Sequence, residues 1–249
     1  MIIYEKQKSI ALIKLNNPEK RNALSPELIK QLKDKLVEAK EDYSVKVLII
    51  TGEGKSFCAG ADLKYLIDLK NNSAIENQID TNSLAELFLM IYNFPKPTMA
   101  AVNGAAIAGG CGLAGVCDFI VADKDHSKFG YSEVKIGFIP AIVSIFLINR
   151  IGGGRARQLL ITGDIIDAKE AREIGFVNYL SDDALKFSIE LAERLCKNSS
   201  LSMNETKLMI NKISSMNVEE AVEYCVQLNT LSRSTEDFKK GIEKFLNKK

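Results

Sequence analysis

The sequence predicts an α/β core followed by a helical C-terminal segment. In the first half, β-branched apolar runs at Ser9–Leu15 and Val45–Thr51 enclose an amphipathic stretch. Strands that alternate with helices favour a largely parallel sheet with right-handed crossovers. From about Ala168 onward the periodicity is helical, apart from a short strand-like segment at Phe176–Leu180. Periodicity alone therefore gives an α/β fold class that becomes all-α toward the C-terminus.

The individual elements follow from local chemistry. Ser25 is expected to be the N-cap of the first helix, with Pro26 at its first position. Leu28, Leu32 and Leu36 repeat every four residues and give that helix one apolar face. The other expected elements are a helix at Asn82–Asn93 ended by Pro95 and Pro97, strands at Thr98–Val102 and Phe119–Ala122, and helices at Ala184–Asn198, Ser202–Ser214, Val218–Ser232 and Thr235–Asn247.

Composition narrows the class of protein. The 249 residues are 46% hydrophobic and 26% charged, and 33 basic residues balance 32 acidic ones. A chain without an overall basic surplus is not expected to bind nucleic acid in bulk. Five cysteines form no C-x-x-C pair, which is typical of reduced thiols in a cytosolic protein. No apolar run reaches membrane-spanning length and the N-terminus has no leader pattern, so we expect a cytoplasmic protein.

Two blocks of small residues are the most informative feature of the chain. They are SFCAGADL at Ser56–Leu63 and NGAAIAGGCGLA at Asn103–Ala114. Glycine and alanine let a ligand approach the main chain, so that backbone N–H groups become the binding groups. Two such turns, about fifty residues apart, predict a pair of N–H donors around one oxygen that becomes negative during a reaction.

With LNNPEKRNALS at Leu15–Ser25, these blocks make the chain resemble the crotonase (enoyl-CoA hydratase/isomerase) superfamily over nearly its whole length. The resemblance implies a spiral of β-β-α turns followed by a helical C-terminal region that builds trimers. We therefore expect residues 1–190 to form the spiral core with the coenzyme A site and the active site. Residues 191–249 are expected to form the helical region of a homotrimer or a dimer of trimers.

The same resemblance implies an oxyanion hole. In this family the residue before the glycine of the A-G-x-D element supplies one N–H, which is Ala59 here. The second N–H maps to Gly109, just before a helix expected to begin near Cys111. Orphan amides at a helix N-terminus favour negative charge, which suits a thioester carbonyl that becomes an enolate.

Catalytic carboxylates are the point at which the chain departs from the family pattern. Hydratases of the family usually carry two glutamates, and the first of these positions maps to Gly112. The second maps to Glu133 in FGYSEVKIGFIP, where Tyr131, Val134 and Ile136 predict a partly apolar pocket. Burial in such a pocket would raise the pKa of Glu133 toward a range useful for proton transfer.

Several reactions stay open at this point. A lyase that hydrates a 2-enoyl-CoA is preferred, because SEVKIGFIPA resembles a branch that includes methylglutaconyl-type hydratases. A double-bond isomerase that uses Glu133 alone fits the lone carboxylate. A non-catalytic acyl-CoA-binding member and a decarboxylase are further alternatives. Gly110–Gly115 also matches the G-x-G-x-x-G dinucleotide pattern, but it does not directly follow a strand, which disfavours an oxidoreductase.

The acyl-CoA substrate would bring coenzyme A with it, so no separate cofactor is expected. No spacing of histidine, cysteine and carboxylates predicts a metal site. The positions that the resemblance assigns to coenzyme A are Lys20, Arg21, Ala23, Leu24, Ala61, Asp62, Leu63, Phe245 and Lys248, the last two reaching a neighbouring subunit's nucleotide.

Overall fold

The computed structural model describes residues 1–247, except for the side chains of Leu63 and Phe245. A six-stranded sheet forms its centre, in the order β1-β2-β3-β5-β7-β10. All neighbours in it run parallel except β1 and β2. The strands are β1 (Ile2–Gln7), β2 (Ile10–Leu15), β3 (Val47–Gly52), β5 (Thr98–Val102), β7 (Phe119–Asp123) and β10 (Tyr179–Ser181).

A second sheet of four short strands, in the order β4-β6-β8-β9, supplies the site. Its strands are β4 (Ser56–Cys58), β6 (Ala105–Ile107), β8 (Lys128–Gly130) and β9 (Ile165–Asp167). β3, β5 and β7 of the large sheet are each followed by one strand of the small sheet and then by helical structure. The chain thus makes three successive β-β-α turns, as the resemblance implied.

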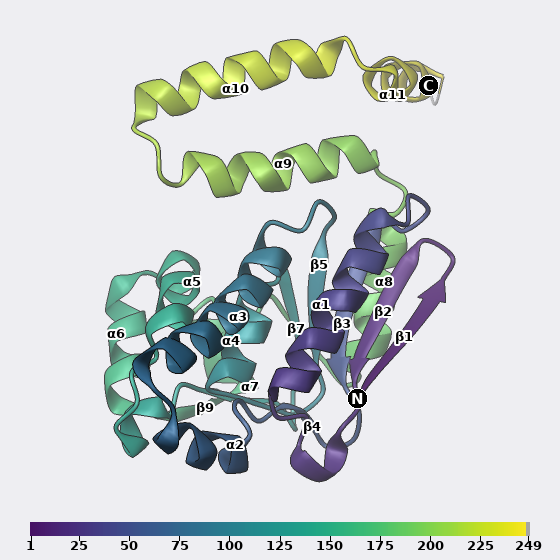
Figure 1. Cartoon of the computed structure of the whole chain (residues 1–249). Helices are drawn as coiled ribbons and strands as arrows, with labels where there is room; N and C mark the ends of the chain where they lie inside the picture. The colour runs from purple at the N-terminus through teal and green to yellow at the C-terminus, as the bar shows by residue number, and fades with distance from the viewer. Residues whose placement is uncertain (248–249) are drawn as a thin grey trace.

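The large sheet is covered on both faces. Side chains of β2 alternate between two cores, with Ile13 and Leu15 in one and Ile10 and Leu12 in the other. Helices α1 (Pro26–Glu41) and α3 (Ala74–Tyr92) pack on the first face, and α8 (Ala184–Leu195) covers the second (Figure 1). The side chain of Ser25 accepts the N–H of Leu28, which confirms the predicted start of α1.

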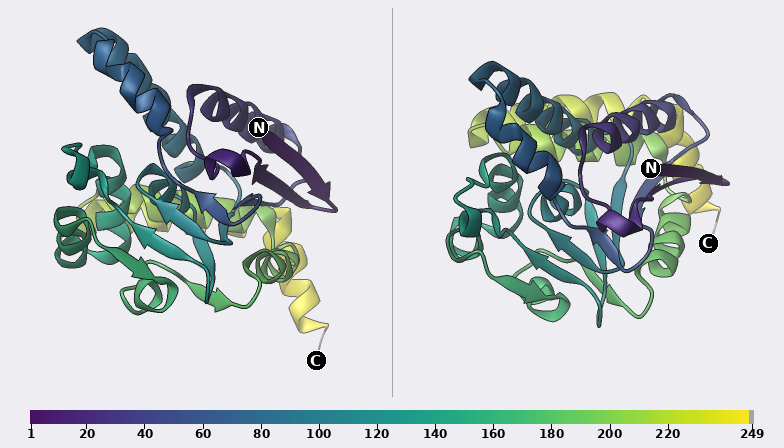
Figure 2. Two further views of the ribbon diagram at one scale, coloured as in Figure 1. Left: turned by 90° about the horizontal axis from the view of Figure 1, so that it is seen from below. Right: turned by 60° about the horizontal axis from the view of Figure 1, so that its bottom comes forward.

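The remaining helices surround the core. They are α2 (Leu63–Asp68), α4 (Gly109–Gly115), α5 (Ala141–Ile151), α6 (Gly153–Thr162) and α7 (Ala168–Glu173), with 3-10 turns η1 (Pro18–Lys20), η2 (Leu69–Asn71) and η3 (Glu133–Ile136). The N-terminal part of α3 projects beyond the body (Figure 2). Within residues 1–247, no helix has the length and apolar character needed to cross a membrane.

The C-terminal region consists of α9 (Ser200–Ile213), α10 (Val218–Arg233) and α11 (Glu236–Leu246). α9 and α10 lie side by side at one end of the body (Figure 1). Because α8 packs on the sheet up to Leu191 and Ala192, the structural change to this region lies after α8. The expected boundary between residues 190 and 191 falls inside that helix.

Candidate active site

Three candidate segments follow three neighbouring strands of the small sheet. β4, β6 and β8 are parallel and adjacent. The first small-residue block continues from β4, Gly109 begins α4 just after β6, and Glu133 begins η3 after β8. Ligands in α/β proteins bind outside the carboxyl ends of parallel strands, where such segments meet. The topology therefore brings together groups that are far apart in the sequence.

The first block is held against the N-terminal turn by backbone hydrogen bonds. The N–H of Ala59 donates to the carbonyl oxygen of Arg21 at 3.0 Å, so this predicted donor already has an acceptor. Leu24 donates to Gly60 and accepts from Asp62, forming a bridge opposite Ala61. Among residues 1–247, the structure gives the Ala61 N–H no acceptor. An available amide of this block is therefore that of Ala61, which sequence reasoning had placed in the coenzyme A site.

Gly60 brings the two blocks into contact. Its backbone is left-handed, with φ of 85°, and a Cβ added there would lie 2.7 Å from the carbonyl oxygen of Ile107. The same Cβ would lie 3.4 Å from the amide nitrogen of Gly109. Only glycine permits both this conformation and this approach. The peptide that carries the Ala61 N–H starts at Gly60, so the two candidate amides belong to adjacent segments.

Gly109 is the first residue of α4, two positions earlier than the helix start expected from the sequence. The first amides of a helix have no acceptor within that helix. Ala108, just before it, has φ of 52° and ψ of −123°, a conformation unusual for a residue with a side chain. Its own N–H donates to Gly130 at 2.7 Å, which ties this turn to the end of β8. Backbone strain is thus concentrated where the Gly109 amide is presented.

Glu133 is buried, with 8% of its surface exposed. Its Oε2 atom is buried and has no hydrogen-bond partner among the described residues. Burial raises the pKa of this carboxyl above its ordinary value, as predicted. The expected reason is only partly right, because Tyr131 is buried whereas Val134 and Ile136 are exposed. A buried carboxyl group with a raised pKa and an unpartnered oxygen is suited to proton transfer to or from a bound molecule.

The position of the missing glutamate is filled by other side chains. A Cβ on Gly112 would lie 2.4 Å from Cγ1 of Val143 in α5 and 3.3 Å from Cε2 of Phe88 in α3. Both residues are buried. A second carboxylate therefore has no space at this position. Glu133 is the one buried carboxylate in α4 and η3.

The N-terminal turn contributes a cation beside the first block. Nζ of Lys20 lies 2.6 Å from Oδ2 of Asp62, and Oδ1 of Asp62 accepts the N–H groups of Lys64 and Tyr65 at the start of α2. The Lys20 ammonium lowers the pKa of Asp62. Asp62 is thereby a helix cap, a local role that the resemblance did not indicate.

Sequence reasoning missed Asn22, which braces this turn. Asn22 is fully buried, with φ of 57°. Its Nδ2 donates to the carbonyl oxygens of Glu53 and Ser56, and its Oδ1 accepts the N–H of Asn17. The run R-N-A-L between a 3-10 turn and a helix cap was the available indication, since asparagine tolerates left-handed backbone and bonds to nearby main chain.

The other predicted contacts are placed as follows. Ala23 and Leu24 are buried with 6% and 4% exposure, and Arg21 is exposed in a left-handed conformation. Lys248 and the side chains of Phe245 and Leu63 lie outside the described residues. The coenzyme A assignments thus stay predictions, on a turn whose backbone the structure fixes.

Cys58 and Cys111, which flank the two amides, are buried. Burial raises the pKa of each thiol to about 12. Nucleophilic cysteines need a lowered pKa and some exposure. These two side chains therefore act as small packing residues, in line with the sequence interpretation.

Comparison with known proteins places this chain in one family. The family model described as enoyl-CoA hydratase/isomerase matches residues 5–249. The chain belongs to the enoyl-CoA hydratase/isomerase family. A Thermus thermophilus protein, whose name describes it as an enoyl-CoA hydratase, is 41% identical over 242 residues, covering 96% of this chain and 95% of that protein. The crotonyl-CoA hydratase of Syntrophomonas wolfei is 35% identical over 252 residues, covering 100% of this chain and 95% of that protein.

The fold agrees with solved members of the enoyl-CoA hydratase/isomerase family. The crystal structure of an enoyl-CoA hydratase from Shewanella pealeana matches with a TM-score of 0.95 at 27% identity, over 100% of this chain and 94% of that chain. These comparisons identify the protein as an enzyme of this family with a crotonase fold. The filled space at Gly112 therefore occurs in a member of this family.

Proposed function

We propose that this enzyme adds water to a 2-enoyl-CoA thioester, or removes it in the reverse direction. The observation that carries the proposal is the buried Oε2 of Glu133, which has no hydrogen-bond partner among residues 1–247. Glu133 follows β8, which pairs with β6, the strand before Gly109. The relatives named above, which carry hydratase names, support the choice of hydration.

The step uses one carboxylate and one water molecule. The water oxygen bonds to the β-carbon of the enoyl group while Glu133 accepts the proton that the water loses. The electron pair of the double bond moves to the thioester oxygen, where the amides of Ala61 and Gly109 stabilise the enolate. Glu133 then returns the proton to the α-carbon, and the product is a 3-hydroxyacyl-CoA.

Ala61 takes the place of Ala59 in this proposal for a physical reason. The Ala59 N–H would have to break its 3.0 Å hydrogen bond to Arg21 before it could bind a substrate oxygen. The Ala61 N–H needs no such change. An oxyanion hole is effective because its donors are oriented before the reaction begins.

Double-bond isomerisation is the second candidate, and the packing at Gly112 favours it. An isomerase needs one group that removes a proton from C2 of a 3-enoyl-CoA and returns it to C4. Glu133 alone can do both, whereas two-carboxylate hydration has no room here for its second group.

Two substrates separate these reactions. Purified protein is given a 2-enoyl-CoA and, separately, a 3-enoyl-CoA, and the absorbance of the conjugated thioester is followed. Hydration lowers it in the first assay, and isomerisation raises it in the second. Glu133→Gln should reduce the turnover by roughly 10²–10⁴-fold. Turnover that is low and unaffected by this substitution would favour a non-catalytic acyl-CoA-binding protein.

We also propose that the helical C-terminal region assembles copies of the chain into a trimer. Val218, Val222 and Val226 lie four residues apart on α10, and each is more than half exposed. An apolar stripe this open is typical of an interface. Light scattering of the purified protein should give three or six times the mass of one chain. A monomeric mass would contradict the proposal.

We propose a cytoplasmic location because the cysteines are unpaired. All five are unpaired in the structure, and three of them are buried. Free thiols persist in reducing compartments. Fractionation of cells that produce the protein would test the location.

A further inference from the structure

The residues of α4 do not favour a helix by themselves, so tertiary contacts must hold it in place. Four of its seven residues are glycine, which disfavours helix, and a helix this short is not stable by itself. Its N-terminal end is confined by the first block, since a Cβ on Gly110 would lie 2.1 Å from the carbonyl oxygen of Cys58. Contacts at the other end of α4 therefore act together with this confinement on the position of the Gly109 amide.

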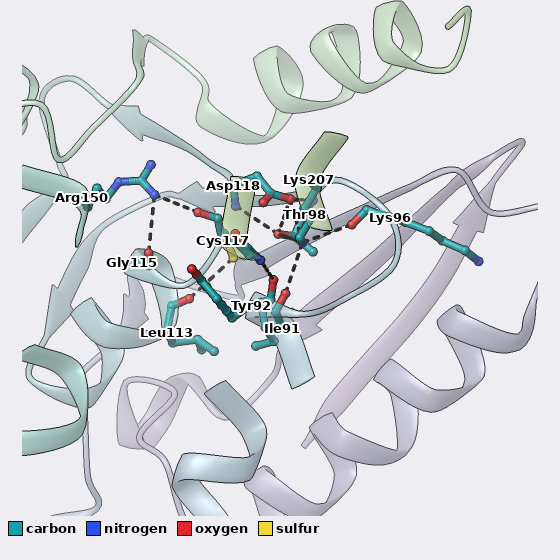
Figure 3. A network of polar contacts seen from close by, with 11 residues as sticks. Ile91, Tyr92, Lys96, Thr98, Leu113, Gly115, Cys117, Asp118, Arg150 and Lys207 are labelled. Atoms are coloured by element: carbon teal, nitrogen blue, oxygen red, sulfur yellow. Dashed lines mark hydrogen bonds and ion pairs between the residues drawn. The ribbon is translucent and has the colours of Figure 1, made fainter. Parts of the chain in front are cut away.

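Arg150, from the last turn of α5, makes those contacts. Its Nη1 donates to the carbonyl oxygen of Cys117 at 2.8 Å and to that of Gly115 at 3.5 Å, just beyond and at the end of α4. Figure 3 shows the guanidinium beside these two carbonyl groups. A cation that bonds to the last carbonyls of a helix satisfies orphan acceptors and complements the helix dipole.

Two further bonds immobilise Arg150 itself. Its Nε donates to the carbonyl oxygen of Phe176 at 2.7 Å, and its Nη2 donates to Oδ1 of Asn178 at 2.6 Å. Asn178 is in turn fixed to β7, because its N–H donates to Ile120 and its Oδ1 accepts the Ile120 N–H. The planar guanidinium uses donors in several directions at once, which a lysine ammonium cannot reproduce.

The chemistry of these partners is unusual for a partly buried cation. All four acceptors are neutral, and burial lowers the pKa of Arg150. Lys207, on the other side of Cys117, instead pairs with the carboxylate of Asp118 at 2.9 Å and joins α9 to the sheet (Figure 3). The partly buried Arg150 and the buried Lys207 thus flank one junction, and of these two cations only Arg150 bonds to the end of α4.

We propose that Arg150 is a positioning residue for the reaction, which holds the carboxyl end of α4 and thereby sets the Gly109 amide at the substrate carbonyl. This rests on the oxyanion hole of the proposed function. Arg150 acts through α4 and does not touch the substrate. Its removal should cost enolate stabilisation while leaving ground-state binding of the acyl-CoA nearly unchanged.

The test compares Arg150→Met and Arg150→Lys with Lys207→Met, which removes a buried cation at the same junction without touching α4. Turnover of a 2-enoyl-CoA is measured together with binding of acetoacetyl-CoA, which forms an enolate, and butyryl-CoA, which does not. Arg150→Met should lower kcat by about 10–100-fold and change KM less than about threefold. It should weaken acetoacetyl-CoA binding and leave butyryl-CoA binding within about twofold. Lys207→Met should keep kcat within about twofold.

Other outcomes overturn the proposal. Arg150→Met with the kcat of the control, or equal losses for both ligands, would mean that Arg150 is only structural. If Arg150→Met does not fold, Arg150→Lys provides the test, because lysine keeps the positive charge but lacks the planar guanidinium. A wild-type kcat in Arg150→Lys would contradict the proposal. A wild-type protein inert toward every enoyl-CoA overturns the proposed function instead, and the two-ligand comparison still tests Arg150.

Discussion

Cγ1 of Val143 lies 2.4 Å from the point at which a Cβ on Gly112 would stand. Val143 has 4% of its surface exposed, and Phe88, which also faces Gly112, is fully buried. Both side chains are thus packed in the interior of the protein. Absence of the second carboxylate is therefore part of the packing of α4 against α5 and α3, and not a change at one position only.

The Gly112→Glu variant should be destabilised by at least about 2–3 kcal/mol, because it overpacks the core and buries a carboxyl group. Gly112→Glu combined with Val143→Ala should regain part of this loss. A double-mutant cycle in urea should give a coupling free energy of about 1–3 kcal/mol. Strict additivity would mean that Val143 does not limit the space.

The same double variant tests the chemistry. With a second carboxylate admitted, the ratio of hydration to isomerisation should rise above that of the wild type, because two groups can then orient the water. Both assays on the double variant and on Val143→Ala alone measure this ratio. If the added carboxylate left this ratio unchanged, the residue at position 112 would not determine which reaction the enzyme favours.

Gly60→Ala should abolish most of the activity. The left-handed backbone and the 2.7 Å approach to Ile107 both exclude a side chain, so the two amides would be forced apart. Gly175→Ala is a matched control, since Gly175 has φ of 84° and nothing within 4 Å of an added Cβ. Both variants should lose about 1 kcal/mol of stability or more. Only Gly60→Ala should lower kcat, by roughly 10²-fold or more; equal activity of the two variants would contradict this.

The sequence predicted the elements whose chemistry is local. Thr98–Val102 is a strand with the predicted bounds, and α1 begins at the predicted cap. The small sheet was not predicted, because β4, β6, β8 and β9 are three residues long and have too few side chains for a period to emerge. α5 and α6 were also missed, since glycine and proline near Pro140 and Gly152 are typical of loops as well as helix boundaries.

At the candidate site, the sequence indicated which residues to consider but not how they are bonded. Glu133 and Gly109 are predicted site residues because a motif specifies their positions. That the Ala59 amide is occupied follows from Arg21, which is distant in sequence and lies in a turn braced by Asn22. The filling of the Gly112 position by Val143 is likewise a tertiary contact, which no spacing within one segment could predict.

Asn22→Gly should destabilise the protein by about 2–3 kcal/mol. Glycine retains the left-handed backbone, so the loss reports the side-chain bonds to Glu53, Ser56 and Asn17. Arg21→Gly is the control, because Arg21 has φ of 51° and an exposed side chain; it should be neutral or stabilised by up to about 1 kcal/mol. Urea unfolding of both variants measures these effects, and equal changes would mean that the bonds of Asn22 contribute nothing.

Ionisation of Glu133 should have opposite effects on stability and on activity. Because burial raises its pKa, the folded state binds its proton more tightly than the unfolded state does. The contribution of this group to the free energy of unfolding is therefore fully present below the ordinary pKa of 4.5 and is lost as the pH rises through the raised value. Activity, which needs the ionised base, should rise over that same range.

Glu133→Gln removes this titration, so the variant should be more stable than the wild type at neutral pH and lose that advantage below pH 4.5. The difference in unfolding free energy should grow by at most about 1.4 kcal/mol per pH unit. Glu76→Gln supplies the reverse sign, since bonds from Ser73 lower the pKa of Glu76. That variant should be less stable than the wild type at neutral pH and approach it in acid. Denaturant unfolding at several pH values measures both differences, and a Glu133→Gln difference independent of pH would mean that this carboxyl is not held in a desolvated position.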